Sequence, residues 1–498
     1  MAIRFVPNDP LAVGVVPPRE QPPRPAPGGL QVDFSYAAEI PENVYPLDSI
    51  EFRFWQCREA ALATIETWGA LAPLPTVWQN GQRRLPLNHD AGPGLEAHYD
   101  RTAVACLSWE TDVRKTYAAS STDAVSHEVG HALLDATRPE LWASVYPEPA
   151  AFHEAFADCM ALLVGFFDAP SRQALVQGAL LRTANFLETL AEDVAEGIRL
   201  ERPNDPQSLA RRALNTLQWA IPGTLPPAGL PAALTAEAHS FSRIFTGCFY
   251  DTICNIFAAQ PNQDEQGLLA AAQTAGRLLI AGATTAAEGP RFFQAVGRGM
   301  MIADEAAGGA NRAAIRDGFA AHSIAIGSTV TFAPTSGLVG AAPTVDTAAG
   351  TAALSPAVRR DLLERIGAPG GRLSVTSHTL GAKTVAKAVH RRNVPLGKLD
   401  RRLKGVVVPA SESVFVGSSA DRAVVLGQLP HAQTTIDEVH QFVTTLMEHG
   451  TLGLAAAKRT ATGKPAEPEG PYLPTHTLQK RGGKTVLNRI RFSCGVTP

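Results

Sequence analysis

The sequence predicts an α+β protein, and three stretches of different character support that prediction. Residues 30–122 mix strand and helix spacing, and residues 123–323 carry alanine-rich helical segments such as EQGLLAAAQTAGRLLIAGATTAA. Residues 352–498 return to short strand candidates around one helix. At 498 residues the chain is too long for one core, since a domain takes roughly 150 residues. We therefore expect several structural units along the chain.

Two segments rich in proline or glycine separate these units. Residues 1–29 include PPREQPPRPAPGG, whose prolines favour an extended, polyproline-like N-terminal arm over helix or strand. Residues 324–351 have few charges and no helical period, unlike the segment before them. They are rich in glycine, threonine, proline and alanine, which is typical of a linker. We expect boundaries at both segments.

The stretch after the linker predicts a separate α+β unit over residues 352–498. RLSVTS, LKGVVVP and ESVFVG are strand candidates, and TIDEVHQFVTTLMEH is the helix candidate. Thr435 and Glu438 in that helix have the spacing of a capping box. The sequence gives this unit no evident role.

Charge and composition exclude several classes of partner. A formal net charge of -3, with no long run of lysine and arginine, predicts no nucleic-acid partner and no membrane surface. The first residues lack the apolar core of a secretory signal, and no stretch approaches the roughly 20 apolar residues of a spanning helix. Six cysteines without a CxxC pair are typical of reduced thiols. We expect a cytoplasmic protein with small or peptidic partners.

The segment HEVGH carries the first candidate metal ligands. His127 and His131 are four residues apart, so both imidazoles lie on one face of a helix and can reach one ion. Glu128 lies on the next face, which suits a carboxylate that takes a proton from metal-activated water. The alternative is a helix whose two histidines pair with nearby carboxylates.

A second cluster, in HEAFADCMALLVGFF, favours the metal interpretation. Glu154 follows His131 by 23 residues, in what we predict as another amphipathic helix. Two histidines and one glutamate form a recognised ligand set for zinc, with a position left open for water. Asp158, one turn after Glu154, would then orient a ligand histidine. We predict one catalytic Zn²⁺ ion.

These motifs resemble those of the thermolysin-like zinc metalloproteases, in which HExxH lies on one helix and a glutamate ligand lies in an ExxxD element on the next. Here the pattern reads HEVGHALLD and then EAFAD, and Asp123 matches the opening of the family motif. The resemblance implies a two-lobed catalytic unit, with a mixed α/β N-terminal lobe and a mainly helical C-terminal lobe, followed by a smaller α+β domain.

The resemblance also implies an activity and roles for particular residues. It implies a zinc-dependent endopeptidase acting on a peptide or protein substrate. His127, His131 and Glu154 would be the zinc ligands and Glu128 the general base. Asp158 would be the hydrogen-bonding partner of a ligand histidine.

Upstream, GLEAHYDRTAVACLSW resembles the edge strand in which an Asn-Ala pair of the family holds the substrate backbone. The pair here would be Glu96 and Ala97. Glutamate in place of asparagine loses an amide donor and adds charge near the cleft. An ordinary strand is the alternative.

Downstream, EAHSFSRIFTGCFYDTI resembles the family segment whose histidine donates a hydrogen bond to the oxyanion of the reaction. That role would fall to His239, with Glu237 holding its ring, and an ordinary structural histidine is the alternative. Tyr146 would supply a second oxyanion donor. A family arginine should fall in GIRLERPNDP, where Arg199 and Arg202 fit equally poorly, so neither is assigned.

Some features depart from the family and leave other functions open. The acidic run that binds structural calcium is replaced by LLVGFFDAP, so calcium is not predicted. The alternative functions are a catalytically weak zinc-fold recognition module and a self-processing protein regulated by its C-terminal domain. RFSCGVTP loosely resembles the cysteine-switch sequence of the matrix metalloproteases, so Cys494 is either a thiolate that blocks the metal or an ordinary strand-end cysteine.

Overall fold

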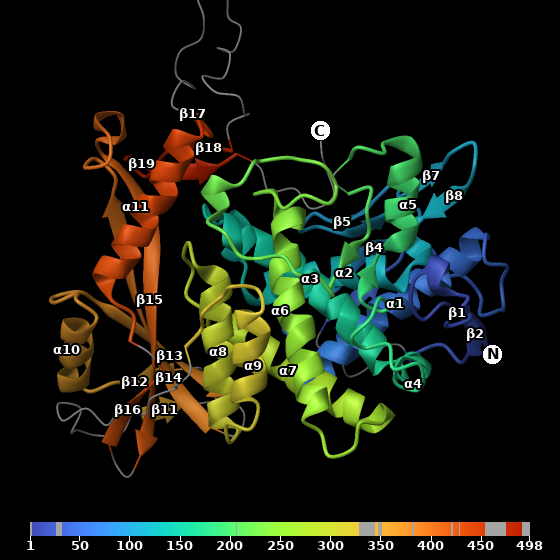
Figure 1. Cartoon of the computed structure of the whole chain (residues 1–498), viewed down its shortest axis with the longest axis horizontal. Coiled ribbons are helices and arrows are strands. Elements are labelled where there is room, and N and C mark those ends of the chain that lie inside the picture. Colours follow the sequence, from blue (N-terminus) through green and yellow to red (C-terminus); the bar gives the residue numbers. More distant parts are fainter. Residues whose placement is uncertain are drawn as a thin grey trace, which may run out of the picture.

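The chain was analysed as a computed structural model, which describes residues 2–25, 32–205, 207–327, 344–346, 351–380, 383–419, 422–427, 429–453 and 475–490. Within those ranges it combines helices and strands, so the predicted α+β character is confirmed at that level. In Figure 1 the helices fill the centre, small strands lie to the right, and the C-terminal sheet stands at the left.

The N-terminal part combines one long helix with short strands. The strands are β1 (Ile3–Phe5), β2 (Arg19–Gln21), β3 (Asp33–Ser35), β4 (Arg84–Asn88), β5 (Ala97–Tyr99), β6 (Val104–Cys106), β7 (Ser108–Glu110) and β8 (Lys115–Tyr117). Four of them form a sheet in the order β3-β4-β6-β5, so β5 lies at its edge. Helix α1 (Ile50–Leu71) is buried at 16 of its 22 positions, which explains why its sequence shows no single apolar stripe.

Residues 2–25 do not form the extended arm that the prolines predicted. Strand β1 pairs with β2 in antiparallel register, and Ile3 and Phe5 are buried against Phe54 and Trp55 of α1. Two strands of three residues are too short to show an alternating pattern, so the sequence did not reveal them. This segment is part of the folded N-terminal unit.

The middle of the chain is mainly helical. Its helices are α2 (Thr122–Thr137), α3 (Pro147–Phe167), α4 (Ala169–Gln177), α5 (Glu192–Glu201), α6 (Ala238–Ala258), α7 (Glu265–Thr285), α8 (Phe292–Ala306) and α9 (Arg312–Ala320). Helix α3 is central and packs against α2, α6, α7 and α8. By length and composition α3 could cross a membrane, but 94% of its most apolar window is buried inside the protein, so core packing accounts for its apolar character.

The C-terminal part is a sheet flanked by two helices. Its strands are β11 (Thr344–Asp346), β12 (Thr351–Ala353), β13 (Leu373–Leu380), β14 (Lys383–Pro395), β15 (Val406–Ser419), β16 (Arg422–Leu426), β17 (Leu452–Gly453), β18 (His476–Arg481) and β19 (Lys484–Arg489). The order is β11-β12-β13-β14-β15-β19-β18-β17, with β16 paired to β15. Among the predicted strands, RLSVTS lies in β13, while LKGVVVP and ESVFVG belong to the single strand β15.

The helices of this sheet differ from the prediction. Helix α10 (Pro356–Arg365) was not predicted. Helix α11 (Ala432–Glu448) begins after His431, whose side chain accepts a hydrogen bond from the Gln433 amide. Thr435 therefore lies inside α11, and the predicted capping box of Thr435 and Glu438 does not start the helix.

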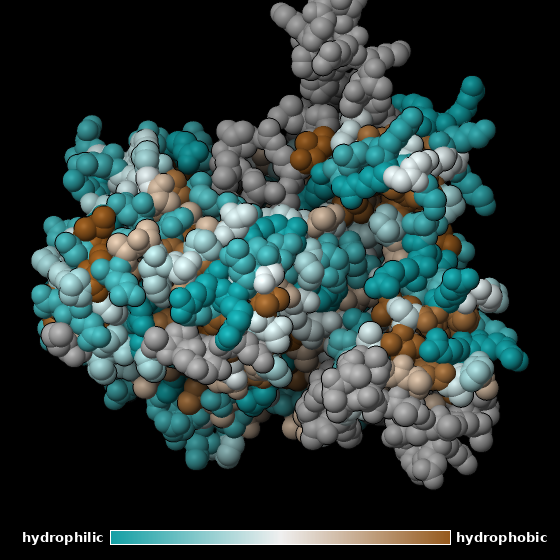
Figure 2. Space-filling model, turned by 180° about the vertical axis from the view of Figure 1, so that it is seen from behind, coloured by the Kyte–Doolittle hydropathy of each residue, from teal (hydrophilic) through white to brown (hydrophobic). Residues whose placement is uncertain are grey.

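The C-terminal sheet packs on the loop that precedes α3. Val145, Tyr146 and Leu487 belong to one buried cluster. The Tyr146 hydroxyl donates to the Pro409 carbonyl of β15 at 2.7 Å, and His476 Nε2 lies 2.7 Å from the Val145 carbonyl oxygen. Seen from behind in Figure 2, the protein is largely hydrophilic, and its hydrophobic residues lie in small separate groups.

Candidate metal centre

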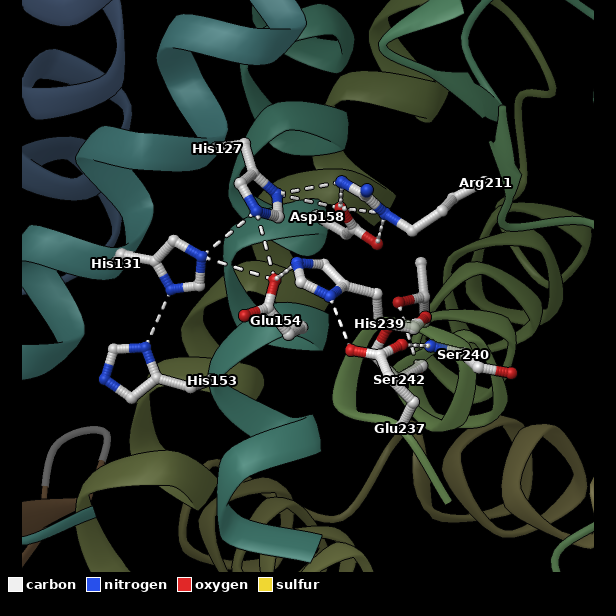
Figure 3. Close-up of polar contacts among 11 residues, drawn as sticks. His127, His131, His153, Glu154, Asp158, Arg211, Glu237, His239, Ser240 and Ser242 are labelled. Atoms are coloured by element: carbon white, nitrogen blue, oxygen red, sulfur yellow. Dashed lines mark hydrogen bonds and ion pairs between the residues drawn. The ribbon is translucent and has the colours of Figure 1, made fainter. Parts of the chain in front are cut away.

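Three buried side chains from the adjacent helices α2 and α3 converge. His127 and His131 come from α2 and Glu154 from α3, and their ligand atoms all lie within 4.8 Å of one another. His127 Nε2 is 3.0 Å from His131 Nε2. Glu154 Oε2 is 3.4 Å from His127 Nε2 and 3.5 Å from His131 Nε2. Figure 3 shows both rings pointing at this carboxylate.

These separations fit a tetrahedral metal site. Two ligand atoms that each lie about 2.0–2.1 Å from a zinc ion are roughly 3.3–3.4 Å apart at a tetrahedral angle. The three separations of 3.0, 3.4 and 3.5 Å fall around that value. Both Glu154 carboxylate oxygens are buried without a well-aligned hydrogen bond, as expected for a carboxylate shaped to hold a cation. The cluster could therefore hold a divalent ion, and its nitrogen and oxygen donors suit zinc among other transition metals.

The registers of α2 and α3 set this geometry. Ser121 caps α2 by accepting a hydrogen bond from the Ala124 amide, which fixes where the helix starts and hence where HEVGH points. Gly130, inside that motif, lies against α3: a Cβ there would be 3.0 Å from Ala157 Cα and 3.1 Å from Met160 Cβ. A larger residue would separate the helices and move the histidines away from Glu154.

Asp158 lies where it can orient His127. Its Oδ1 is 2.8 Å from His127 Nδ1, so the Nε2 atom of the ring faces the cluster. Arg211, in the short strand β10 (Arg211–Arg212), donates to both Asp158 oxygens at 2.7–3.1 Å. This salt bridge fixes the carboxylate against the imidazole.

Sequence reasoning did not find Arg211. The two arginines in GIRLERPNDP, where the resemblance would place a pocket arginine, form ion pairs with other residues. Arg199 pairs with Glu196, and Arg202 pairs with Asp205 at 3.2 Å. The surrounding sequence, LARRALN, has no motif that singles out Arg211. Its position depends on the pairing of β10 with β9 (Thr189–Leu190).

His153 contacts His131, a role that the sequence did not assign. The two Nδ1 atoms are 2.7 Å apart and the rings are stacked, with centroids 5.0 Å apart. Burial, together with the charge of His131, lowers the pKa of His153 well below its ordinary value, so this ring is neutral. When His131 offers Nε2 to a metal, its Nδ1–H donates to His153 Nδ1.

His239 and Glu237 flank the cluster at the start of α6. Glu237 caps α6 by accepting a hydrogen bond from the Ser240 amide. Its other oxygen lies 2.7 Å from His239 Nδ1, while His239 Nε2 lies 3.2 Å from Glu154 Oε2 (Figure 3). The structure thus brings the predicted pair to the cluster, with the His239 ring held between two carboxylates.

Glu128, Glu96 and Ala97 line a small cavity beside the cluster. The cavity measures about 60 Å³, and His127, His239 and Arg211 also line it, with apolar side chains from Leu95, Leu190 and Val194. Burial raises the pKa of Glu96, and the negative charge of Glu128 adds to that rise. Ala97 begins the edge strand β5, as the resemblance implied.

Tyr146 does not join this group, contrary to the resemblance. Its ring is fully buried and packs against Phe442, and its hydroxyl donates to Pro409 in the C-terminal sheet. Tyr146 is the N-cap of α3, two helical turns before Glu154. The eight-residue spacing along the sequence therefore places Tyr146 away from the cluster of His127, His131 and Glu154.

The cluster is a network of compensating charges. Burial opposes the charge on His127, but the hydrogen bond to Asp158 and the ion pair with Glu154 outweigh burial and raise the pKa of the imidazole to about 9. Glu154 and Glu237 keep pKa values below their ordinary ones despite burial, chiefly because the positive charge of His239 lies beside both carboxylates. A bound metal ion would replace protons in neutralising these carboxylates.

No protein-family model and no curated protein matches the chain. Cys494, the proposed metal-blocking thiolate, lies outside the described residues. The geometry of the cluster is therefore the main indication of what the protein does.

Proposed function

We propose that the protein is a zinc-dependent endopeptidase of the thermolysin-like type. The observation that supports this most is the tetrahedral spacing of the His127, His131 and Glu154 ligand atoms. Glu128 and His239 line a cavity against the same ligands, so an acid–base group and a hydrogen-bond donor are both present. Together with the ligands these groups supply the parts that metal-assisted hydrolysis requires.

Each side chain has a distinct part in the proposed hydrolysis. Zinc held at the cluster would polarise the peptide carbonyl and lower the pKa of water. Glu128 accepts the proton from the attacking water and later donates it to the leaving amine. His239 Nε2 donates a hydrogen bond to the oxyanion as charge develops, and Glu237 holds the Nδ1 side of that ring.

The edge strand β5 is the proposed docking site for the substrate. A peptide in extended form adds to such an edge through main-chain hydrogen bonds, which are independent of its sequence. Glu96 and Ala97 lie at the point where β5 meets the cavity. The small cavity beside them favours a small apolar side chain next to the cleaved bond, because Leu190 and Val194 line it.

A catalytically weak recognition module is the second candidate, and Glu96 favours it. The half-buried Glu96 carboxylate adds negative charge beside Glu128; its pKa is raised first by partial burial and further by the charge of Glu128. Two carboxylates side by side repel each other, which disfavours the state in which both are ionised, and a general base must be ionised to accept a proton. A module of this kind would bind peptides without cutting them.

Hydrolysis of a fluorogenic peptide library by zinc-loaded full-length protein separates the two candidates. Endopeptidase activity should be abolished by a chelator and restored by zinc. Glu128→Gln should retain one zinc per chain and lose about 10²–10⁴-fold in kcat. Glu110→Gln, a change in an exposed side chain of β7, is the matched control and should behave like the wild type. A fully active Glu128→Gln variant would remove Glu128 from the mechanism.

A further inference from the structure

A second, larger cavity lies between helix α8 and the C-terminal sheet, which are neighbours in Figure 1. It measures about 550 Å³, within the range of roughly 300–1,000 Å³ that is typical of ligand pockets. None of the residues of the metal centre lines it, so the two cavities are separate sites. The apolar part of its lining includes Met301, Ile302, Phe415 and Leu426.

One wall of this cavity is a gap in the pairing of the C-terminal sheet. Strand β15 pairs along one edge with β14, without a break from Val407 to Val416. Along the other edge, the described strands pair with it at Val406 and Val407, through β19, and from Phe415 onward, through β16. Residues 408–414 therefore have no described strand beside them on that edge.

The backbone groups of Ser411 and Ser413 face this gap. In an antiparallel ladder, alternate residues direct their N–H and C=O groups to opposite edges of the strand. The Val406 carbonyl accepts a hydrogen bond from the Leu396 amide on the β14 side, so the even-numbered residues of β15 face β14 and the odd-numbered ones face the gap. Ser411 and Ser413 both line the cavity, and no described residue bonds to their N–H and C=O groups.

The two ends of the gap are closed, which favours the end of a polypeptide chain over a continuous strand. At one end, Pro409 has no N–H, and its carbonyl already accepts a hydrogen bond from the Tyr146 hydroxyl. At the other end, β16 occupies the edge from Phe415 onward. Ser411 and Ser413 lie between these limits, so an added strand can pair over about three residues.

Two arginines supply positive charge to the same cavity. Arg298 Nε is buried, and no described residue accepts a hydrogen bond from it. The guanidinium of Arg291 lies over the Trp219 ring, 3.7 Å from its centroid, and this stacking holds the arginine in place. A guanidinium matches a carboxylate through two parallel hydrogen bonds. Glu288 and Glu438 also line the cavity, so a basic side chain in the ligand is favoured as well.

We propose that this cavity binds the carboxyl-terminal end of an extended peptide. The last three residues of the peptide pair with Ser411 and Ser413, and the terminal carboxylate lies against Arg291 and Arg298. A basic side chain shortly before the end lies near the two glutamates, and an apolar final side chain contacts the apolar lining. The inference goes beyond the proposed endopeptidase function and does not depend on it.

Fluorescence anisotropy with full-length protein tests this binding. The first probe is a fluorescein-labelled hexapeptide that ends in Lys-Ala-Val with a free carboxylate. The second is the same peptide as a carboxyl-terminal amide. The third is an amide in which glutamate replaces the final valine, so that the carboxylate belongs to a side chain. Mass spectrometry after each titration checks that the probe is intact.

Two variants examine the two kinds of contact. Arg298→Gln removes a positive charge from the cavity, and Arg401→Gln, at an exposed arginine outside the cavity, is its control. Ser413→Pro removes a main-chain N–H from an edge that already accommodates Pro409. Ser413→Ala keeps that N–H and is its control.

The wild type should bind the free-carboxylate probe at least about tenfold more tightly than either amide probe, because the bonds from arginine to the terminal carboxylate are lost. Arg298→Gln and Ser413→Pro should each weaken binding of that probe about tenfold, while both controls keep the wild-type affinity. Equal binding of the free-carboxylate probe and its amide, or no binding at about 1 mM, would overturn the proposal.

Two other outcomes would also contradict it. If the amide ending in glutamate bound as tightly as the free-carboxylate probe, the ligand would be an acidic side chain and not a chain end. If Ser413→Pro bound like Ser413→Ala, the peptide would not pair with β15. The comparison of probes uses the wild type, so it decides the question even if Arg298→Gln unfolds.

Discussion

Lowering the pH from 8 to 6 should weaken metal binding at the cluster by about 100-fold. Without metal, the His127 imidazole has a pKa of about 9, because its hydrogen bond to Asp158 and its ion pair with Glu154 outweigh burial. A metal that binds Nε2 must displace that proton, so below pH 9 each unit lowers the affinity about tenfold, or about 1.4 kcal/mol. Glu154 does not add to the pH dependence of metal affinity, because its pKa is well below the ordinary value and its carboxylate stays ionised.

The assay is a zinc competition titration of metal-free protein against a fluorescent chelator at pH 6, 7 and 8. Calorimetry in two buffers of different ionisation enthalpy counts the released protons, and we expect about one per zinc from His127. Asp158→Asn removes the negative charge that helps to raise the His127 pKa, so the affinity for zinc should depend less steeply on pH. The affinity at pH 8 should also fall about 10–100-fold. Asp317→Asn, on the exposed side of α9, is the control.

One result would refute this reasoning directly. If zinc bound equally well at pH 6 and pH 8, with no proton released in either buffer, His127 would not be a ligand. A variant with Asp158→Asn that kept the full slope would show instead that Asp158 does not set the protonation of His127.

Three further predictions concern single side chains. His239→Gln should lower kcat about 10²–10³-fold with little change in KM, measured on zinc-loaded protein, because its Nε2 faces the cluster. Tyr146→Phe should leave kcat unchanged. It should lower the free energy of unfolding by about 1 kcal/mol, because only the hydrogen bond to Pro409 is lost. A roughly 100-fold drop in kcat would instead place Tyr146 in the cleft. Burial holds the folded-state pKa of Glu148 at about 7, above its ordinary 4.5. Stability should therefore fall by up to about 3 kcal/mol as pH rises from 4.5 to 7, and urea unfolding of Glu148→Gln should show no such fall.

The clustering of His127 and His131 could be predicted because it depends on local geometry. A spacing of four residues puts His127 and His131 on one face of any α-helix, whatever the surrounding fold. The position of Glu154 could not be predicted from helix geometry alone. It depends on the packing of α2 on α3, which Gly130 permits. The downstream ExxxD element supplied that information through the resemblance. The α+β character could also be predicted from local features, because alanine-rich helices and short apolar strands have different patterns of residues in the sequence.

Features that depend on distant contacts could not be predicted. Arg211 reaches Asp158 only because β10 pairs with β9. His476 of β18 lies 2.7 Å from the carbonyl oxygen of Val145, a residue 331 positions earlier in the chain, and no local pattern could have indicated that contact. The prediction that Tyr146 lies in the site was wrong. Tyr146 is close to Glu154 in the sequence, but its ring packs on the C-terminal sheet.

Zinc K-edge X-ray absorption of the full-length protein is the most direct measurement of the ligand set. The geometry predicts one zinc per chain with two imidazole nitrogens, from His127 and His131, at about 2.0–2.1 Å and oxygen from Glu154 at about 2.0–2.2 Å. His131→Ala should remove one imidazole from the spectrum. Protein that takes up no zinc, or a spectrum with water ligands alone, would contradict the metal centre and the proposed hydrolysis with it.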